Sequence, residues 1–279
     1  MSVSSHAEDF LSPASGTTGA VAVPSSTDTS ISPKRLARIA GVLYLLVAIF
    51  SGFALLFVDR KIYVAGNATT TAGNLVAHSG LVRAGFVADL IQATLWIFLA
   101  MALYLLLKHV NRSAAGAMVV LVAIGTAIVC LNAVFRFESL RVATGHVGSA
   151  ALGTAGSNAL ALLLLDTQHF GVLIAQIFFG LWLVPLGYLA YKSGLFPKAL
   201  GVLLIVGGAC YLVDTLALFL VPNFSKTIST AIIIPSTIAE ISMVVYLLVV
   251  GVRTAKPAVQ AERECGGAGQ PACELDAAA

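Results

Sequence analysis

Six long runs of apolar residues with almost no charged side chains constrain this chain more than any other feature. At 1.5 Å per residue, each is long enough to cross the roughly 30 Å hydrocarbon core of a bilayer as an α-helix. The runs are Leu36–Val58, Leu81–Leu107, Ala114–Phe137, Phe170–Tyr191, Ala199–Leu220 and Ser229–Val252. Because lipid offers no partners to backbone polar groups, such runs predict an all-α polytopic membrane protein, a six-transmembrane-helix bundle.

The shortage of charge also excludes whole classes of protein. Of the 279 residues, 58% are hydrophobic and 10% are charged, whereas a soluble domain carries about 25% charged residues. So little charge cannot cover a water-facing surface. This excludes a soluble enzyme, a nucleic-acid-binding domain and a disordered regulator. The lipid bilayer is the expected partner, and no nucleic acid is expected.

The two ends of the chain differ from the apolar runs. Residues 1–32 are rich in Ser, Thr, Ala and Pro, and residues 254–279 are rich in Gly, Ala, Glu and Pro. Such segments cannot bury a core, so we expect two disordered tails. The membrane domain is expected to cover residues 33–253. It begins at Ser32-Pro33, because Pro is favoured at the first helical position.

The segment between the third and fourth runs has a pattern of its own. Residues 138–168 begin with a Gly-rich stretch and then contain a short Ala/Leu run at 159–165. That run is too short to span a bilayer. It predicts a short interfacial or re-entrant helix, ending near residue 166, in an external loop.

The Lys and Arg residues divide unequally between the two ends of the predicted bundle. Ten lie on one side: Lys34, Arg35, Arg38, Lys108, Arg112, Lys192, Lys198, Arg253, Lys256 and Arg263. Six lie on the other: Arg60, Lys61, Arg83, Arg136, Arg141 and Lys226. Short cytoplasmic loops are enriched in positive residues. We therefore expect both termini in the cytoplasm and the loops 59–80 and 138–168 outside.

Polar side chains inside the runs are the candidate functional residues, because each is costly in lipid unless it is paired or hydrated. The candidates for ligand binding or proton relay are Asp89, Gln92, Asn132, Arg136, Gln176, Asp214 and Glu240. Helical spacing places them on stripes with small residues, which favours positions inside the bundle. They predict a polar pocket that opens to the external side.

The charges in this predicted pocket do not balance. Three carboxylates, Asp89, Asp214 and Glu240, share one well-placed cation, Arg136. An Asp89–Arg136 pair could hold the second and third spans together without any further role. Glu240 lies deepest and has no obvious cation, so it is the stronger functional candidate.

Three histidines, His78, His146 and His169, are expected on the external side. They could in principle hold a metal or haem, with His169 the best placed. No carboxylate accompanies them at ligand spacing, however, and loops rarely give imidazoles a fixed second shell. No metal and no cofactor are therefore expected.

Several stretches resemble one bacterial membrane family. They are Phe178–Pro197, Leu200–Leu204 and Tyr211–Asp214, with Leu36–Leu46 and Arg83–Leu90 matching its first two helices. The family is catalogued as domain of unknown function 4386, and the resemblance covers about residues 34–253. It implies a multi-helix protein of the bacterial cytoplasmic membrane and brings no catalytic role with it.

The function expected from these features is non-enzymatic. The protein would bind or translocate a small solute or proton through an outward-facing polar pocket, with a homo-oligomer as the expected assembly. One alternative is a membrane enzyme or redox subunit that uses His169 with Asp89 or Glu240. Another is a structural or accessory subunit with no ligand.

Overall fold

The computed structural model describes residues 32–146 and 149–253, apart from a few side chains. The tails expected at 1–32 and 254–279 lie outside these residues, except for Ser32. The Ser32 hydroxyl oxygen accepts a hydrogen bond from the Arg35 backbone N–H at 3.4 Å and caps the first helix, which starts at Pro33 as predicted.

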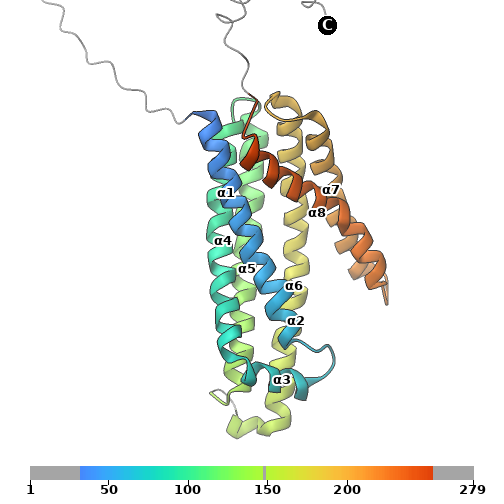
Figure 1. The fold of residues 1–279 in the computed structure, drawn as a ribbon. Coiled ribbons are helices and arrows are strands. Elements are labelled where there is room, and N and C mark those ends of the chain that lie inside the picture. The colour runs from blue at the N-terminus through green and yellow to red at the C-terminus, as the bar shows by residue number, and fades with distance from the viewer. Residues whose placement is uncertain (1–31, 147–148, 254–279) are drawn as a thin grey trace, which may run out of the picture. The chain divides into compact units, whose positions relative to one another are not determined.

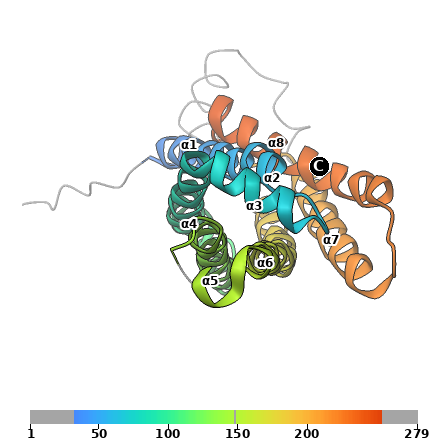
Figure 2. The ribbon, with the colours of Figure 1, turned by 90° about the horizontal axis from the view of Figure 1, so that it is seen from below.

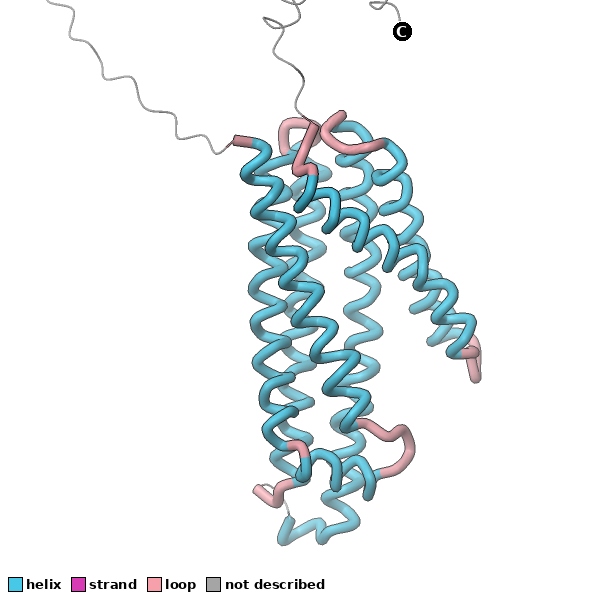
Figure 3. Tube along the Cα trace, viewed as in Figure 1, coloured by secondary structure: helices cyan, strands magenta, loops and turns pink. Residues whose placement is uncertain are grey.

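The described chain is helical throughout, with loops confined to the helix ends (Figure 3). The helices are α1 Pro33–Gly52, the π-helix η1 Phe53–Val58, α2 Asp59–Ile62, α3 Ala68–Ala77, α4 Ser79–Leu107, α5 Arg112–Ala143, α6 Ser149–Ser193, α7 Lys198–Leu220 and α8 Lys226–Val249. Six of the described helical segments are long and apolar enough to cross a membrane. The prediction of an all-α, six-span membrane protein is confirmed.

The first span is one continuous helix of three parts. α1, η1 and α2 run together from Pro33 to Ile62, a length of 30 residues. The π-helical turn at Phe53–Val58 widens the helix, and such turns occur frequently at functional sites. It is followed directly by Asp59, the first residue of α2.

A short helix that the sequence did not predict follows the first span. α3 lies in the 59–80 loop and crosses that end of the bundle (Figure 2). Asn67 caps its N-terminus by accepting from the Thr70 N–H, and Asn74 donates to the Ile62 carbonyl. The bond from Asn74 holds α3 against the end of α2.

The short interfacial helix expected at 159–166 was predicted wrongly. Residues 154–193 form one uninterrupted part of α6, and the backbone departs from helical geometry at Gly153, where φ is +64°. No Gly or Pro separates the Ala/Leu run from the fourth span. Its polar residues 166–169 therefore stay helical, and two of them, Asp166 and His169, contact Tyr63 on the first loop.

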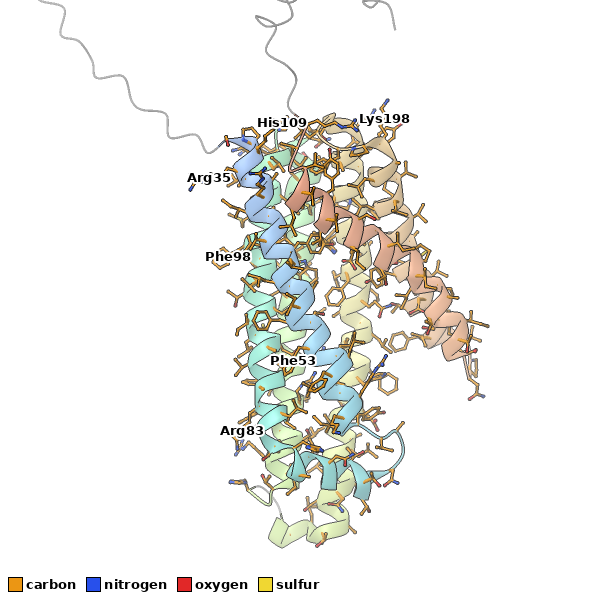
Figure 4. The ribbon with its side chains drawn as sticks, viewed as in Figure 1. Arg35, Phe53, Arg83, Phe98, His109 and Lys198 are labelled. Carbon is orange, nitrogen blue, oxygen red and sulfur yellow. The ribbon has the colours of Figure 1, made fainter. Side chains whose placement is uncertain are left out.

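The long helices form a ring in the order α1, α4, α5, α6, α7, α8, with α8 returning to α1 (Figure 1). We call the end that holds Pro33, Leu107, Ser193 and Val249 the tail end, and the end covered by α3 the cap end. Arg35, His109 and Lys198 lie at the tail end, Arg83 lies near the cap end, and Phe98 lies between them on the outer surface (Figure 4).

Glycines let neighbouring helices come close on one side of the ring. A Cβ on Gly187 of α6 would lie 2.6 Å from the Gly201 carbonyl oxygen of α7, and one on Gly208 would lie 2.6 Å from the Gly180 carbonyl oxygen. α8 touches α1 at the tail end, where a Cβ on Gly41 would lie 3.0 Å from Leu247. From there the two helices diverge toward the cap end (Figure 1).

Candidate functional site

An ion-pair cluster lies near the cap end, centred on Arg136 of α5. The Arg136 Nη1 donates to Asp59 Oδ1, and its Nη2 donates to Asp59 Oδ2 at 3.3 Å. Its Nε lies 3.2 Å from Asp89 Oδ2, but the two atoms are not aligned for a hydrogen bond. The three side chains are 2%, 18% and 11% exposed in the order Arg136, Asp59 and Asp89. We call these three residues the outer cluster.

The structure places Asp89 beside Arg136 as the sequence suggested, but it gives Arg136 a stronger partner that the sequence reasoning missed. Asp59 directly follows the apolar run that ends at Val58 and precedes the basic pair Arg60-Lys61, so it was assigned to a loop. The continuation of the first span through η1 into α2 brings Asp59 to α5 instead. The spacing of residues along a single helix cannot predict such a contact between two helices.

A second polar group surrounds Tyr63, just beyond the first span. The Tyr63 hydroxyl donates to Asp166 Oδ1 at 2.6 Å, and its ring stacks on His169 with centroids 5.6 Å apart. Burial, together with the neighbouring Asp166 carboxylate, raises the pKa of Tyr63 to about 12. His169 is exposed and pairs with neither Asp89 nor Glu240. No metal-holding group of His, Cys, Asp and Glu occurs in the described part of the chain.

Glu240 of α8 is held by two tyrosines from two other helices. Tyr44 of α1 donates its hydroxyl to Glu240 Oε1 at 3.0 Å, and Tyr211 of α7 donates to Oε2 at 2.9 Å. No described Lys, Arg or His side chain forms an ion pair with Glu240. Both carboxylate oxygens therefore have neutral donors and neither has a cation. The sequence reasoning identified Glu240 but missed both tyrosines, since they count as apolar in a hydropathy pattern.

The remaining candidates lie apart from these groups. Gln176 of α6 donates to Asp214 Oδ2 of α7 at 3.1 Å, while the buried Asp214 Oδ1 has no partner among the described residues. Asn132 of α5 packs against Gly171 of α6, where a Cβ would lie 2.0 Å from its Oδ1. The structure thus does not gather the seven predicted residues into one pocket.

A cleft of about 600 Å³ lies between α1 and α8. Its polar lining includes Tyr44, Gln92, Tyr211 and Glu240. Most of the remaining lining is apolar or aromatic, and both tryptophans of the chain, Trp96 and Trp182, belong to it. Gln92 is buried and has no hydrogen-bonded side-chain partner among the described residues. Of the predicted site residues, Gln92 and Glu240 both line this cleft.

The arrangement separates two kinds of chemistry. The outer cluster pairs its cation with two carboxylates and joins α2, α4 and α5. The cleft combines one carboxylate, one amide and the hydroxyls of two tyrosines, Ser51 and Thr237 with an otherwise apolar wall. Pockets of this size and lining are typical of small-molecule sites.

The known proteins that the chain resembles carry no functional name. Over 54 residues the chain is 43% identical to a protein of Archaeoglobus fulgidus named "Uncharacterized protein". That alignment covers 19% of this chain, and the chain spans only 33% of the relative's length. No solved structure matches the chain. Residues 39–251 match the family described as "Domain of unknown function (DUF4386)". This match covers most of the chain, so this multi-pass membrane protein belongs to the DUF4386 family.

Proposed function

We propose that the protein is a non-enzymatic membrane protein that binds a small solute in the cleft between α1 and α8. The observation that carries this proposal is the placement of Glu240. Its carboxylate stands in the wall of a roughly 600 Å³ cleft, fixed by Tyr44 and Tyr211 and free of any described cation. An ionisable residue inside a membrane domain is a functional candidate by default, because its burial is costly.

The proposed binding site is this cleft and not a single pocket formed by the seven polar residues expected from sequence. Arg136 contacts both Asp59 and Asp89, and Gln176 contacts Asp214. Their partners are protein groups, so we assign them to helix packing. Gln92 and Glu240 are the residues that we propose contact the solute.

Both tryptophans line the cleft, which gives a direct binding assay. Triphenylmethanol, a neutral aromatic probe with one hydroxyl, is titrated into the full chain in phosphatidylcholine nanodiscs. We expect a saturable change of tryptophan emission. Ala48→Phe, which fills the cleft, should abolish this change, whereas Ala127→Phe on the exposed surface of α5 should preserve it. A signal that never saturates, or that survives in Ala48→Phe, would contradict binding in the cleft.

We further propose that the tail end faces the cytoplasm of a bacterial cell. Basic side chains gather there, and Arg35 and Lys198 are two of them (Figure 4). Positive residues favour the cytoplasmic side. A membrane-impermeant thiol reagent should then label Cys265 and Cys273 in inside-out vesicles but not in intact cells. Labelling in intact cells would reverse the orientation.

A further inference from the structure

We propose that the solute of the cleft is an amphiphilic cation, with one positive charge on an apolar body, and that it enters sideways from the bilayer. This inference rests on the proposed function and adds the charge and the route of the solute. It follows from the hydrogen bonds of Glu240, the missing counter-charge, the composition of the cleft wall and the divergence of α1 and α8.

Both oxygens of Glu240 accept hydrogen bonds, which offset part of the cost of burying it as a carboxylate. Oε1 accepts from the Tyr44 hydroxyl at 3.0 Å, and Oε2 accepts from the Tyr211 hydroxyl at 2.9 Å. Hydrogen bonds donated to both oxygens stabilise a carboxylate relative to the protonated acid. The three residues come from α8, α1 and α7, so three helices fix the position of the negative charge.

The protein supplies no described positive charge to balance it. Arg136 is the buried cation among the described residues of the spans, and it is already paired with Asp59 and Asp89. An unpaired carboxylate in a low-dielectric setting attracts a positive charge strongly, since solvent screens it little. The missing charge is the part that a ligand would bring.

The rest of the cleft wall suits an apolar body and stabilises a cation further. Trp96, Trp182 and Phe179 stand in the lining with Leu55 and Val245. The two tryptophan rings lie 5.8 Å apart in an edge-to-face arrangement. Aromatic faces attract organic cations through the ring quadrupole. A solute with one positive charge and a wide apolar surface matches both features.

The opening of the cleft faces lipid. α1 and α8 touch near Gly41 and Leu247 and then diverge toward the cap end (Figure 1). Between them, cleft-lining side chains such as Leu56, 56% exposed, and Ile241, 58% exposed, reach the outer surface of the bundle. A solute dissolved in the bilayer would therefore reach Glu240 without crossing the packed core at the tail end.

The test compares two probes of the same shape and opposite charge. Tetraphenylphosphonium and tetraphenylborate are titrated separately into the full chain in phosphatidylcholine nanodiscs, with tryptophan emission as the readout. Each affinity is referred to the probe's own concentration in the lipid, because the two ions partition differently. We expect Glu240→Gln to weaken tetraphenylphosphonium binding at least tenfold and to leave tetraphenylborate binding unchanged or stronger.

The control variant is Glu138→Gln, which removes a half-buried carboxylate that pairs with Arg141 outside the cleft. It should bind both probes as the wild type does. If Glu240→Gln does not assemble, the pH dependence of the wild type replaces it. Tetraphenylphosphonium binding should then weaken as Glu240 takes up a proton on acidification, the groups facing Glu240 being the neutral Tyr44 and Tyr211.

The outcomes separate the two proposals. The inference is overturned if Glu240→Gln weakens the binding of both ions equally. It is also overturned if the affinity for tetraphenylphosphonium changes neither in the variant nor with pH in the wild type. If triphenylmethanol still binds saturably in that case, the proposed function stands without the charge preference. If none of the three probes binds saturably, both proposals fail.

Discussion

The outer cluster and Glu240 show two ways of placing carboxylates in a membrane domain. In the outer cluster, one guanidinium meets two carboxylates, so charge is compensated by the protein itself. At Glu240 the described residues supply two tyrosine hydroxyls and no cation, and the carboxylate borders a cleft. The difference separates charges that hold helices together from a charge left for something else. It also predicts that replacing a carboxylate by its amide changes the stability of the protein in opposite directions at the two places.

The largest effect is expected from Arg136→Gln. It leaves Asp89 buried and Asp59 half-buried without a cation, and removing one partner of a buried ion pair costs about 3–5 kcal/mol. Thermal melting in detergent should show a drop of many degrees. Arg141→Gln removes one partner of an exposed i,i+3 pair. Its free energy of unfolding should stay within about 0.5 kcal/mol of the wild-type value. If both variants have the same melting temperature, the outer cluster does not stabilise the packing of the helices.

The two carboxylates of the outer cluster should differ from each other. Asp59→Asn removes a two-point interaction with Arg136 and should cost about 1–3 kcal/mol. Asp89→Asn removes a carboxylate that is not aligned with Nε and relieves repulsion between two acids. We expect its stability to stay within about 1 kcal/mol of the wild type. Denaturation of both variants under identical conditions checks the order, and a reversed order would mean that Asp89 is the main partner.

A smaller, pH-dependent effect is expected at Tyr63. Its pKa in the fold is about 12, raised by burial and by Asp166, against about 10 in an unfolded chain. The neutral hydroxyl is therefore favoured by folding. Its stabilisation is complete below pH 10 and is lost as the pH rises toward 12. Tyr63→Phe should lower the melting temperature slightly at pH 8, and the difference from wild type should shrink between pH 10 and 12. A constant difference would contradict this assignment.

Much of the fold could be predicted because lipid leaves few choices. The six spans follow from the lengths of the apolar runs, and the Asp89–Arg136 contact follows from the helical stripes. The prediction of a separate interfacial helix at 159–166 was wrong because polar residues alone do not end a helix. Residues 166–169 are polar and yet remain within α6. Contacts between helices were the main gap. Asp59 reaches Arg136 because the first span continues through the π-helical turn into α2, and Tyr44 and Tyr211 contact Glu240 from helices far apart in sequence.

Glu240→Gln measured beside Asp59→Asn tests most directly whether Glu240 is kept for binding. Groups kept for function commonly cost stability, whereas groups kept for packing contribute to it. Glutamine can still accept a tyrosine hydroxyl and carries no charge to bury. We expect Glu240→Gln to melt at or above the wild-type temperature while Asp59→Asn melts several degrees below it. If Glu240→Gln melts as low as Asp59→Asn, Glu240 is a packing group and the cleft loses its proposed ligand site.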